Sequence, residues 1–305
     1  MKFLVTGAGQ IGSQLVSDLV AGGHDVVVLR RRDSPVEGAD VLSGDVLDGR
    51  LLRKAMAGVA AVFHCVHTAY DAKKWKEFLP SRERAVMDAA ADAGIPVIFP
   101  ESVYGFGDQS VDLPEGAKLS PRSPLGEVRA LLLTAREQHR ARTVSVVASD
   151  LWGPTALPAT SVAHLAVLVP RPQGKRGYAL GNPSLPHTLT YIPDLTSAMI
   201  YSAMHAGALA PAGDRILHTP SPETGSLEDL NELVSLRSGV RYKRLLPVPN
   251  VLLRTAGLVS PMMAELKNQA YLWNRPAILR SGVLAEEHGL KATTFEAGLE
   301  ATRTR

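Results

Sequence analysis

The stretch that decides the fold lies at the very start of the chain, where residues 2–12 read Lys-Phe-Leu-Val-Thr-Gly-Ala-Gly-Gln-Ile-Gly. The run from Lys2 to Thr6 has the length and apolar character of a buried strand. Residues 11–21 repeat their apolar side chains with helical periodicity and stop at two glycines. A strand, a glycine-rich turn and a helix in this order predict a turn that binds a nucleotide phosphate.

Each glycine of this turn has a separate task. Gly7 permits the tight turn, Gly9 lets the backbone approach a pyrophosphate, and Gly12 lets the helix pack closely on the strand. The first helical residues, Gln10 and Ile11, bring free N–H groups and the positive end of the helix dipole to the phosphates. These five residues are predicted to bind a dinucleotide. A glycine-rich turn in another α/β fold is the alternative.

The residues after the second expected strand, 24–29, indicate which dinucleotide is bound. In NAD-binding proteins an acidic residue there binds the ribose 2′-hydroxyl. This chain has Arg30, Arg31 and Arg32 instead. A guanidinium can bind a 2′-phosphate through two hydrogen bonds, so the sequence favours NADP(H) over NAD(H). The alternative is that some of these arginines are simply solvated.

Two further segments are expected at the same sheet edge. Asp45 and Val46 follow the third expected strand, where a carboxylate can accept a hydrogen bond from the adenine amino group. Cys65, Val66 and His67 end the fourth expected strand and are predicted to pass the cofactor as a backbone turn. The spacing of His64 and His67 suggests a metal site, but both histidines fall in an extended strand-to-loop segment, so none is predicted.

Strands and helices continue to alternate along the first half of the chain. Helices are expected over 51–57, 71–93 and 122–140, and strands over 60–65, 95–99 and 143–148. This alternation predicts an α/β fold with a doubly wound parallel Rossmann sheet. Residues 1–150 are predicted to form the NADP(H)-binding domain, with 186–206 returning to it. Residues 151–305 are predicted to form mostly a smaller substrate-binding lobe, with short strands over 178–180, 189–192 and 216–218.

Composition excludes several classes of protein. The 305 residues carry a net charge of only +3 with no long run of like charge, which gives no support for nucleic-acid binding. The longest apolar runs are too short to span a membrane. A single cysteine and the absence of a secretory signal before the first strand favour the cytoplasm. The oligomeric state stays open.

Six segments, in order, resemble the extended short-chain dehydrogenase/reductase family, which includes the NAD-dependent epimerases and dehydratases. They are Val5-Thr6-Gly7, Gly44-Asp45-Val46-Leu47-Asp48, Val62-Phe63-His64-Cys65, Ser102-Val103-Tyr104-Gly105, Ser149-Asp150-Leu151-Trp152-Gly153-Pro154 and Tyr191-Ile192-Pro193-Asp194-Leu195. The resemblance covers nearly the whole chain. The first glycine loop is one residue shorter than the family pattern.

The chain departs from the family at its catalytic Tyr-x-x-x-Lys motif. The matching positions hold Leu125 and Arg129. Leucine has no proton to donate and arginine is a poor acid, although Arg129 could still bind the nicotinamide ribose. Ser102 and Tyr104, on the loop that the resemblance places beside the nicotinamide, are the remaining candidates for assisting catalysis.

Without the tyrosine, the sequence resembles a small group of ketoreductases in this family that act on polycyclic aromatic antibiotics, of the angucyclinone type of the simocyclinone pathway. We therefore expect an NADPH-dependent reductase of a bulky aromatic ketone. A phenolic hydroxyl next to that ketone would supply the missing proton donor. The alternatives are a non-catalytic NADP(H)-binding sensor or scaffold protein, and an epimerase or dehydratase with a relocated acid.

The second lobe is expected to hold this substrate. Trp152 and Tyr191 are candidates for lining its pocket, and His187 replaces an arginine that many sugar-nucleotide enzymes of the family place there. Two expected helices, 251–258 and 262–273, carry Leu, Met, Tyr and Trp and could close over an apolar ligand, although ordinary core packing would look the same.

Overall fold

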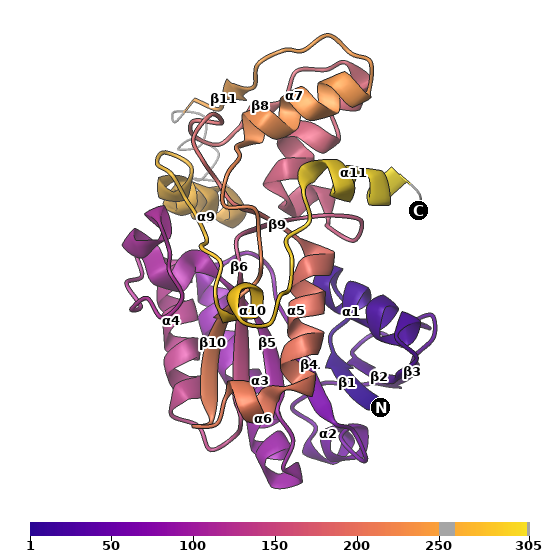
Figure 1. Cartoon of the computed structure of the whole chain (residues 1–305). Coiled ribbons are helices and arrows are strands. Elements are labelled where there is room, and N and C mark those ends of the chain that lie inside the picture. The colour runs from indigo at the N-terminus through magenta and orange to yellow at the C-terminus, as the bar shows by residue number, and fades with distance from the viewer. Residues whose placement is uncertain (250–259, 304–305) are drawn as a thin grey trace. The chain divides into compact units, whose positions relative to one another are not determined.

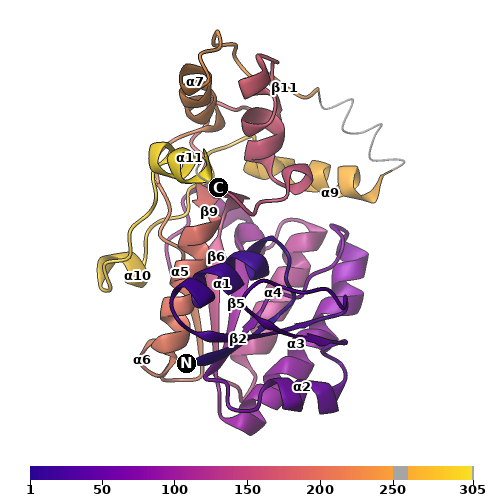
Figure 2. The same cartoon turned by 90° about the vertical axis from the view of Figure 1, so that its right-hand side faces the viewer.

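The computed structural model describes residues 1–249 and 260–303. These residues form two compact units, each built from separate stretches of the chain (Figures 1 and 2). The first unit contains 1–102, 128–147 and 195–217, and the second contains 103–127, 148–194 and 218–305. Among the described residues, no helix has both the length and the apolarity needed to cross a lipid bilayer.

The first unit is built on a seven-stranded sheet with the strand order β10-β6-β5-β4-β1-β2-β3. The strands are β1 (Lys2–Thr6), β2 (Asp25–Arg30), β3 (Asp40–Ser43), β4 (Ala61–His64), β5 (Val97–Ser102), β6 (Thr143–Ala148) and β10 (Asp214–His218). β1 lies in the interior of the sheet and pairs in parallel with β2 and β4. The chain therefore winds outward from β1 in both directions, and this confirms the predicted doubly wound α/β fold.

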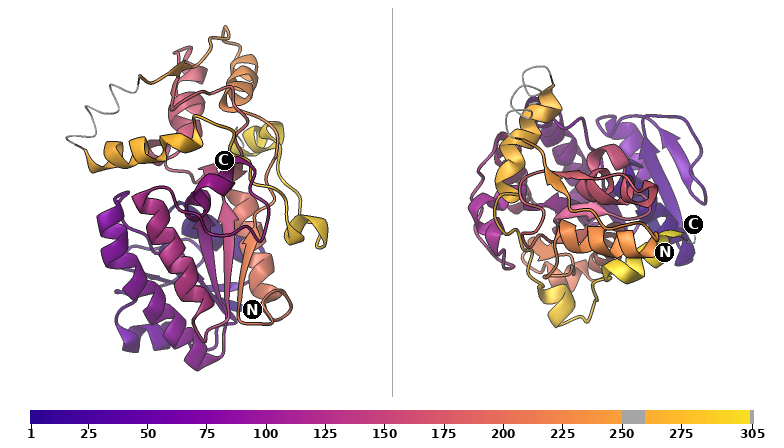
Figure 3. Two further views of the ribbon diagram at one scale, coloured as in Figure 1. Left: turned by 90° about the vertical axis from the view of Figure 1, so that its left-hand side faces the viewer. Right: turned by 90° about the horizontal axis from the view of Figure 1, so that it is seen from above.

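Helices cover both faces of this sheet. They are α1 (Gln10–Ala21), α2 (Gly49–Ala55), α3 (Ala72–Ala93), α4 (Pro124–Glu137), α5 (Ile192–Met204) and α6 (Ala206–Leu209). α2 packs on α3, and α3 is joined to α4 by an ion pair between Glu83 and Arg136. α1 is joined to α5 by a hydrogen bond from Thr196 to Asp18. Figure 3 (left) shows α3 and α4, purple to magenta, to the left of the sheet and therefore on one of its faces.

Local sequence explains where these helices begin and end. The Asp71 carboxylate accepts hydrogen bonds from the first N–H groups of α3, those of Lys73 and Lys74. Gly94, with φ of 67°, ends the same helix in the left-handed conformation. Asp48 caps α2 in the same way as Asp71 caps α3.

The core of the first unit lies between the sheet and α2 and α3. It contains apolar side chains of β1, β2, β4 and β5, among them Leu4, Val27, Leu29, Val62 and Phe99, packed against Val86, Met87 and Ala90 of α3. Burial of these side chains on one face and of Leu15 and Leu19 of α1 on the other holds the sheet between two apolar layers. The carboxyl ends of the strands are thereby fixed in position.

The second unit consists of short elements. Its short strands are β7 (Asp150–Trp152), β8 (Tyr178–Ala179), β9 (Leu189–Tyr191) and β11 (Leu246–Pro247), and they pair as β7 with β9 and β8 with β11. Its helices are α7 (Leu227–Arg237), α9 (Pro261–Gln269), α10 (Val283–Glu286) and α11 (Phe295–Arg303). Single turns add η1 (Val103–Val111), η2 (Pro158–Thr160), η3 (His164–Leu168), η4 (Arg171–Gln173) and η5 (Ala270–Leu272).

The return of the chain to the first unit differs from the expectation. The expected returning segment was 186–206, whereas residues 195–217 group with the first unit. The strand expected over 216–218 in the lobe is the end of β10, which forms the edge of the large sheet next to β6. The helices α5 and α6 return the chain to the first unit before β10 begins. Leu217 of β10 is fully buried.

Candidate functional site

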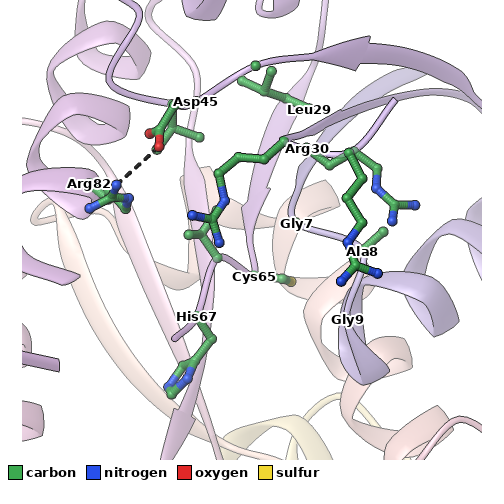
Figure 4. Close-up of a pocket in the computed structure, with 14 residues that line it drawn as sticks. Gly7, Ala8, Gly9, Leu29, Arg30, Asp45, Cys65, His67 and Arg82 are labelled. Carbon is green, nitrogen blue, oxygen red and sulfur yellow. Dashed lines mark hydrogen bonds and ion pairs between the residues drawn. The ribbon is translucent and has the colours of Figure 1, made fainter. Parts of the chain in front are cut away.

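A groove of about 300 Å³ lies at the carboxyl ends of β1, β2 and β4, in the first unit (Figure 4). It is lined by Gly7, Ala8, Gly9, Leu29, Arg30, Arg31, Arg32, Gly44, Asp45, Val46, Cys65, Val66, His67 and Arg82. Nine of the predicted cofactor-binding residues are in this set: Gly7, Gly9, Arg30, Arg31, Asp45, Val46, Cys65, Val66 and His67. Gln10, Ile11, Gly12 and Arg129 are not among the lining residues.

The glycine turn closes one end of the groove. Gly7 has φ of 85°, which favours glycine, and its N–H donates to the Leu29 carbonyl at 2.9 Å. A Cβ on Gly12 would lie 2.0 Å from the Gly7 carbonyl oxygen, so only glycine lets α1 start this close to β1. Around Gly9, the N-cap of α1, a Cβ would meet nothing within 4 Å. The turn therefore leaves open space against bare backbone, which fits a pyrophosphate.

Arginine side chains form the other end. Figure 4 shows Arg30 reaching from the end of β2 into the groove. Within the part of the chain that the structure describes, the guanidinium groups of Arg30, Arg31 and Arg32 have no hydrogen bond and no ion pair. Three unpaired cations at the end of the second strand fit the extra phosphate of NADP(H), because a dianionic ligand would give them the partners that the chain does not.

A fourth arginine, Arg82 of α3, lies across the groove from these three, and the sequence analysis did not find it. Its Nη2 donates to Asp45 Oδ2 at 3.1 Å. Partial burial acts to raise the pKa of Asp45, but the Leu47 N–H, the Arg82 hydrogen bond and the charges of Arg82 and Arg31 outweigh it and hold this pKa below its usual value. Asp45 is therefore a carboxylate with fixed partners.

His67 connects the groove to the interior of the first unit. Its Nδ1 lies 2.9 Å from the Thr68 carbonyl and its Nε2 lies 2.6 Å from Arg129 Nη2. Because a carbonyl only accepts and a guanidinium only donates, His67 carries its proton on Nδ1 and accepts at Nε2. The ring is open to the groove but enclosed by protein on its other sides. This desolvation and the Arg129 charge lower the pKa of His67 to about 4.

Arg129 is held by several contacts. Its guanidinium lies 4.6 Å over the Trp75 ring, and its Nε is 3.5 Å from a carboxylate oxygen of Glu101. Glu101 also pairs with Arg136 at 2.9 Å, which in turn binds Glu83 at 2.8 Å. Arg129 therefore lies behind His67 and not on the groove wall. Contact of Arg129 with a nicotinamide ribose stays a prediction.

His64 and Cys65 have no features of a metal site or a nucleophile. His64 Nδ1 lies 2.7 Å from Thr6 Oγ1, and burial together with the charges of Arg136 and Arg82 lowers its pKa to about 3. Burial raises the pKa of Cys65 to about 12, so its sulfur stays a neutral thiol. Over residues 1–249 and 260–303, no three His, Cys, Asp or Glu side chains are grouped to hold a metal ion.

The candidate catalytic residues lie at the end of β5 and just beyond it. The Ser102 N–H donates to Glu101 Oε1 at 2.7 Å, and the Ser102 hydroxyl is 3.5 Å from the same oxygen. Tyr104 belongs to η1 of the second unit. Leu125, at the position of the expected catalytic tyrosine, is fully buried. Roles for Ser102 and Tyr104 in catalysis stay predictions.

The three candidate substrate residues are buried inside the second unit. Trp152 packs against Tyr191 and Phe295, with ring centroids 4.8 and 5.6 Å apart. His187 Nε2 lies 2.7 Å from Asp150 Oδ2, and its ring stacks on Trp273 at 3.6 Å. None of these side chains lines a described groove, and their contact with substrate stays a prediction. The expected helix over 251–258 lies outside the described residues.

Sequence reasoning missed Arg82 because nothing near it in the chain marks it. It lies 37 residues from Asp45, and only the packing of α3 against the sheet brings the two together. Ala8, Leu29 and Gly44 also line the groove without having been predicted, although each adjoins a residue that was predicted.

The model of the NAD dependent epimerase/dehydratase family matches residues 3–211 of the chain. The chain belongs to this family. Binding of an NAD(P) cofactor is typical of the epimerase/dehydratase family.

Two of the relatives found are similar in sequence over part of the chain. The 2-alkyl-3-oxoalkanoate reductase of Stenotrophomonas maltophilia is 43% identical over 68 residues, which cover 21% of each protein. The UDP-glucose 4-epimerase of Streptomyces lividans is 28% identical over 142 residues, 41% of this chain and 43% of that protein. The alignments span less than half of these relatives.

Solved structures are similar over the whole chain. The dTDP-glucose 4,6-dehydratase DesIV of Streptomyces venezuelae, determined with NAD and TYD bound, has a TM-score of 0.73 at 22% identity, over 99% of this chain and 95% of that one. The enzyme WbmG of Bordetella bronchiseptica, in complex with NAD and UDP, has a TM-score of 0.71 at 17% identity, over 99% and 94%. At identities this low, the structural similarity shows that the proteins share a fold.

Proposed function

We propose that this protein is an NADPH-dependent ketoreductase that acts on a bulky polycyclic aromatic ketone of the angucyclinone type. The observation that carries the proposal is the set of three unpaired arginines, Arg30, Arg31 and Arg32, in the groove that begins at the glycine turn. With Arg82 and Asp45 they give the groove a formal charge of three positive units, from four arginines and one carboxylate. A cofactor with a phosphate on its adenosine ribose suits that charge better than NAD does.

When bound, NADPH supplies a hydride to a carbonyl carbon. The chain's own contribution is to hold the two reactants together. The backbone at Gly9 would leave room for the pyrophosphate, the arginines would bind the 2′-phosphate, and Asp45 would accept a hydrogen bond from the adenine amino group. Proximity of this kind is worth several orders of magnitude in rate without any acid group.

The missing acid limits the reactions that are open. Leu125 is buried and has no proton to donate, and Arg129 is bound to His67 with a guanidinium that stays charged. Loss of a positioned general acid costs about 10²–10⁴ in rate. A ketone with a neighbouring phenolic hydroxyl avoids that loss, because the phenol protonates the new alkoxide and is itself reprotonated by solvent. The partial similarity to a protein named as an oxoalkanoate reductase supports ketone reduction.

The test is oxidation of NADPH by the purified protein with a panel of polycyclic hydroxy-ketones, followed at the NADPH absorbance band. Each ketone is paired with its O-methyl ether, which lacks the phenolic proton but keeps the skeleton. We expect turnover of the free phenols and little turnover of the ethers. Ser102→Ala and Tyr104→Phe should keep substantial activity. A fall beyond about a thousandfold in kcat for either variant would show an enzymic acid and refute the substrate-assisted scheme.

A second candidate function is epimerisation or dehydration of a nucleotide sugar. It is favoured by a groove of about 460 Å³ in the second unit, lined by Arg122, Lys267, Ala270, Tyr271 and Arg275 with two asparagines, where cations could hold a diphosphate. Asp108 already pairs with Arg122 and Arg275, which weakens this case. Turnover of UDP- or dTDP-sugars with no turnover of ketones would favour it. Binding of NADPH with no turnover of either substrate class would indicate a sensor or scaffold protein.

A further inference from the structure

Arg82 is held in one place by three contacts, two with Phe78 of its own helix and one with Asp45 of the loop after β3. Its Nη2 donates to Asp45 Oδ2 at 3.1 Å, its Nη1 donates to the Phe78 carbonyl at 3.2 Å, and its guanidinium lies 5.1 Å over the Phe78 ring. Only 14% of the side chain is exposed. A charged side chain fixed in this way beside the groove restrains whatever it binds.

What it binds is the carboxylate of Asp45, the one acidic side chain among the described residues that line the groove. The other oxygen of this carboxylate, Oδ1, accepts from the Leu47 N–H at 3.1 Å. Asp45 thus has one partner on its own loop and one on α3, and neither partner is an arginine of β2.

Without Arg82, Asp45 would interfere with the basic end of the groove. Arg31 is already close enough for its charge to act on Asp45. A released carboxylate would be drawn toward the unpaired guanidinium groups of Arg30 and Arg31, and it would neutralise the cations that a 2′-phosphate needs. It would also repel a phosphate bound there, whereas the neutral 2′-hydroxyl of NADH would be affected much less.

We infer that Arg82 is a specificity-determining residue for the cofactor, because it holds Asp45 against α3 and keeps the arginines after β2 available for the 2′-phosphate. This inference rests on the proposed use of NADP(H). It assigns to a residue of α3, outside the glycine turn and the second strand, a part in the choice between two dinucleotides.

The experiment measures the Kd of NADPH and of NADH, by titration calorimetry, for the full-length wild type and for Arg82→Met, Asp45→Asn and the double variant. Arg84→Met is the matched control: Arg84 lies on the same helix, its side chain is 77% exposed, and it is 3.9 Å from Asp88. Circular dichroism and melting curves confirm that each variant is folded.

We expect Arg82→Met to weaken NADPH binding by about 10- to 100-fold and NADH binding by less than about threefold, the size expected when charge-assisted hydrogen bonds to the phosphate are lost. The double variant should regain most of the NADPH affinity, because a neutral amide at position 45 no longer competes. Asp45→Asn alone should keep or increase the preference for NADPH over NADH, and Arg84→Met should match the wild type.

Equal loss of both cofactors in Arg82→Met, or no recovery in the double variant, would show that Arg82 has only a structural role. A lowered preference for NADPH in Asp45→Asn, which keeps Arg82, would overturn the inference independently. If the wild type binds neither dinucleotide, the proposed function itself fails. If the wild type and Arg82→Met both bind NADPH normally, the inference about Arg82 is refuted and the proposed function is not.

Discussion

The substitutions Gly12→Ala and Gly9→Ala add the same methyl group at two points of one turn. We expect the first to lower the stability of the fold and the second to lower the affinity for NADPH with little change in stability. At Gly12 the new Cβ would lie 2.0 Å from the Gly7 carbonyl oxygen and 3.0 Å from its carbon. Since non-bonded carbon atoms prefer about 3.5–4.0 Å, α1 must move away from β1 by more than an ångström. That movement separates Leu15 and Leu19, both fully buried, from the sheet. We expect a loss of about 3 kcal/mol or more in the free energy of unfolding.

At Gly9 the methyl group meets nothing within 4 Å, and the backbone φ of −84° suits alanine. The free energy of unfolding should therefore change by less than about 0.5 kcal/mol. The methyl group nevertheless occupies the space in which we place the pyrophosphate. NADPH affinity should fall by about 10- to 100-fold, because relieving the overlap with one added methyl group costs about 1–3 kcal/mol.

Urea denaturation of both variants gives the change in stability, and calorimetric titration of NADPH into Gly9→Ala gives the change in affinity. A Gly12→Ala protein with the wild-type denaturation midpoint would refute the close packing of α1 on β1. A Gly9→Ala protein that binds NADPH as tightly as the wild type would show that this turn does not hold the phosphates, whatever the arginines bind.

Two further predictions concern buried charges. Arg136 is 1% exposed and pairs with Glu83 and Glu101, so Arg136→Met should lower the free energy of unfolding, measured by urea denaturation, by about 3–5 kcal/mol. Changing both glutamates to glutamine as well should restore part of that loss. Full stability of the single variant would contradict this pairing. His64 has a pKa of about 3 when folded and about 6.5 when unfolded, so the unfolded chain binds the extra proton between these values. The contribution of neutral His64 to the free energy of unfolding is therefore complete above pH 6.5 and is lost as the pH falls toward 3, by up to about 1.4 kcal/mol per pH unit. His64→Gln should remove this contribution to the pH dependence of stability. Denaturation midpoints at several pH values measure this, and an identical slope in both proteins would show that His64 titrates normally.

The sequence predicted the first unit well because its signals are local. The strand at 2–6 matches β1, the helix expected over 11–21 matches α1, and the strand expected over 143–148 matches β6. A glycine follows β1 directly and glycines flank α1, whereas β6 is marked by its continuous run of buried residues. The helix expected over 71–93 is correct to one residue, because Asp71 caps it and Gly94 ends it.

The parts that could not be predicted depend on packing between distant residues. Nothing near position 216 shows that β10 joins the large sheet, since that depends on where α5 and α6 carry the chain. In the same way, Arg129 could be matched to a lysine position, but its binding to His67 joins residues 62 positions apart. The aromatic residue Trp152 has the composition expected of a pocket wall, and only the structure shows it packed between Tyr191 and Phe295.

The close approach of Gly12 to Gly7, and of Gly7 to the Cys65 backbone, has a consequence for how this protein can change. A Cβ on Gly7 would lie 3.0 Å from the Cys65 carbonyl oxygen, so the turn between β1 and α1 has no room for a larger side chain at either glycine. The side chains of Arg30, Arg31 and Arg32, by contrast, have no hydrogen bond or ion pair with any other residue that the structure describes. On the proposed use of NADP(H), a change of preference toward NAD(H), in evolution or by redesign, is therefore expected to involve these arginines and not the glycines of the turn.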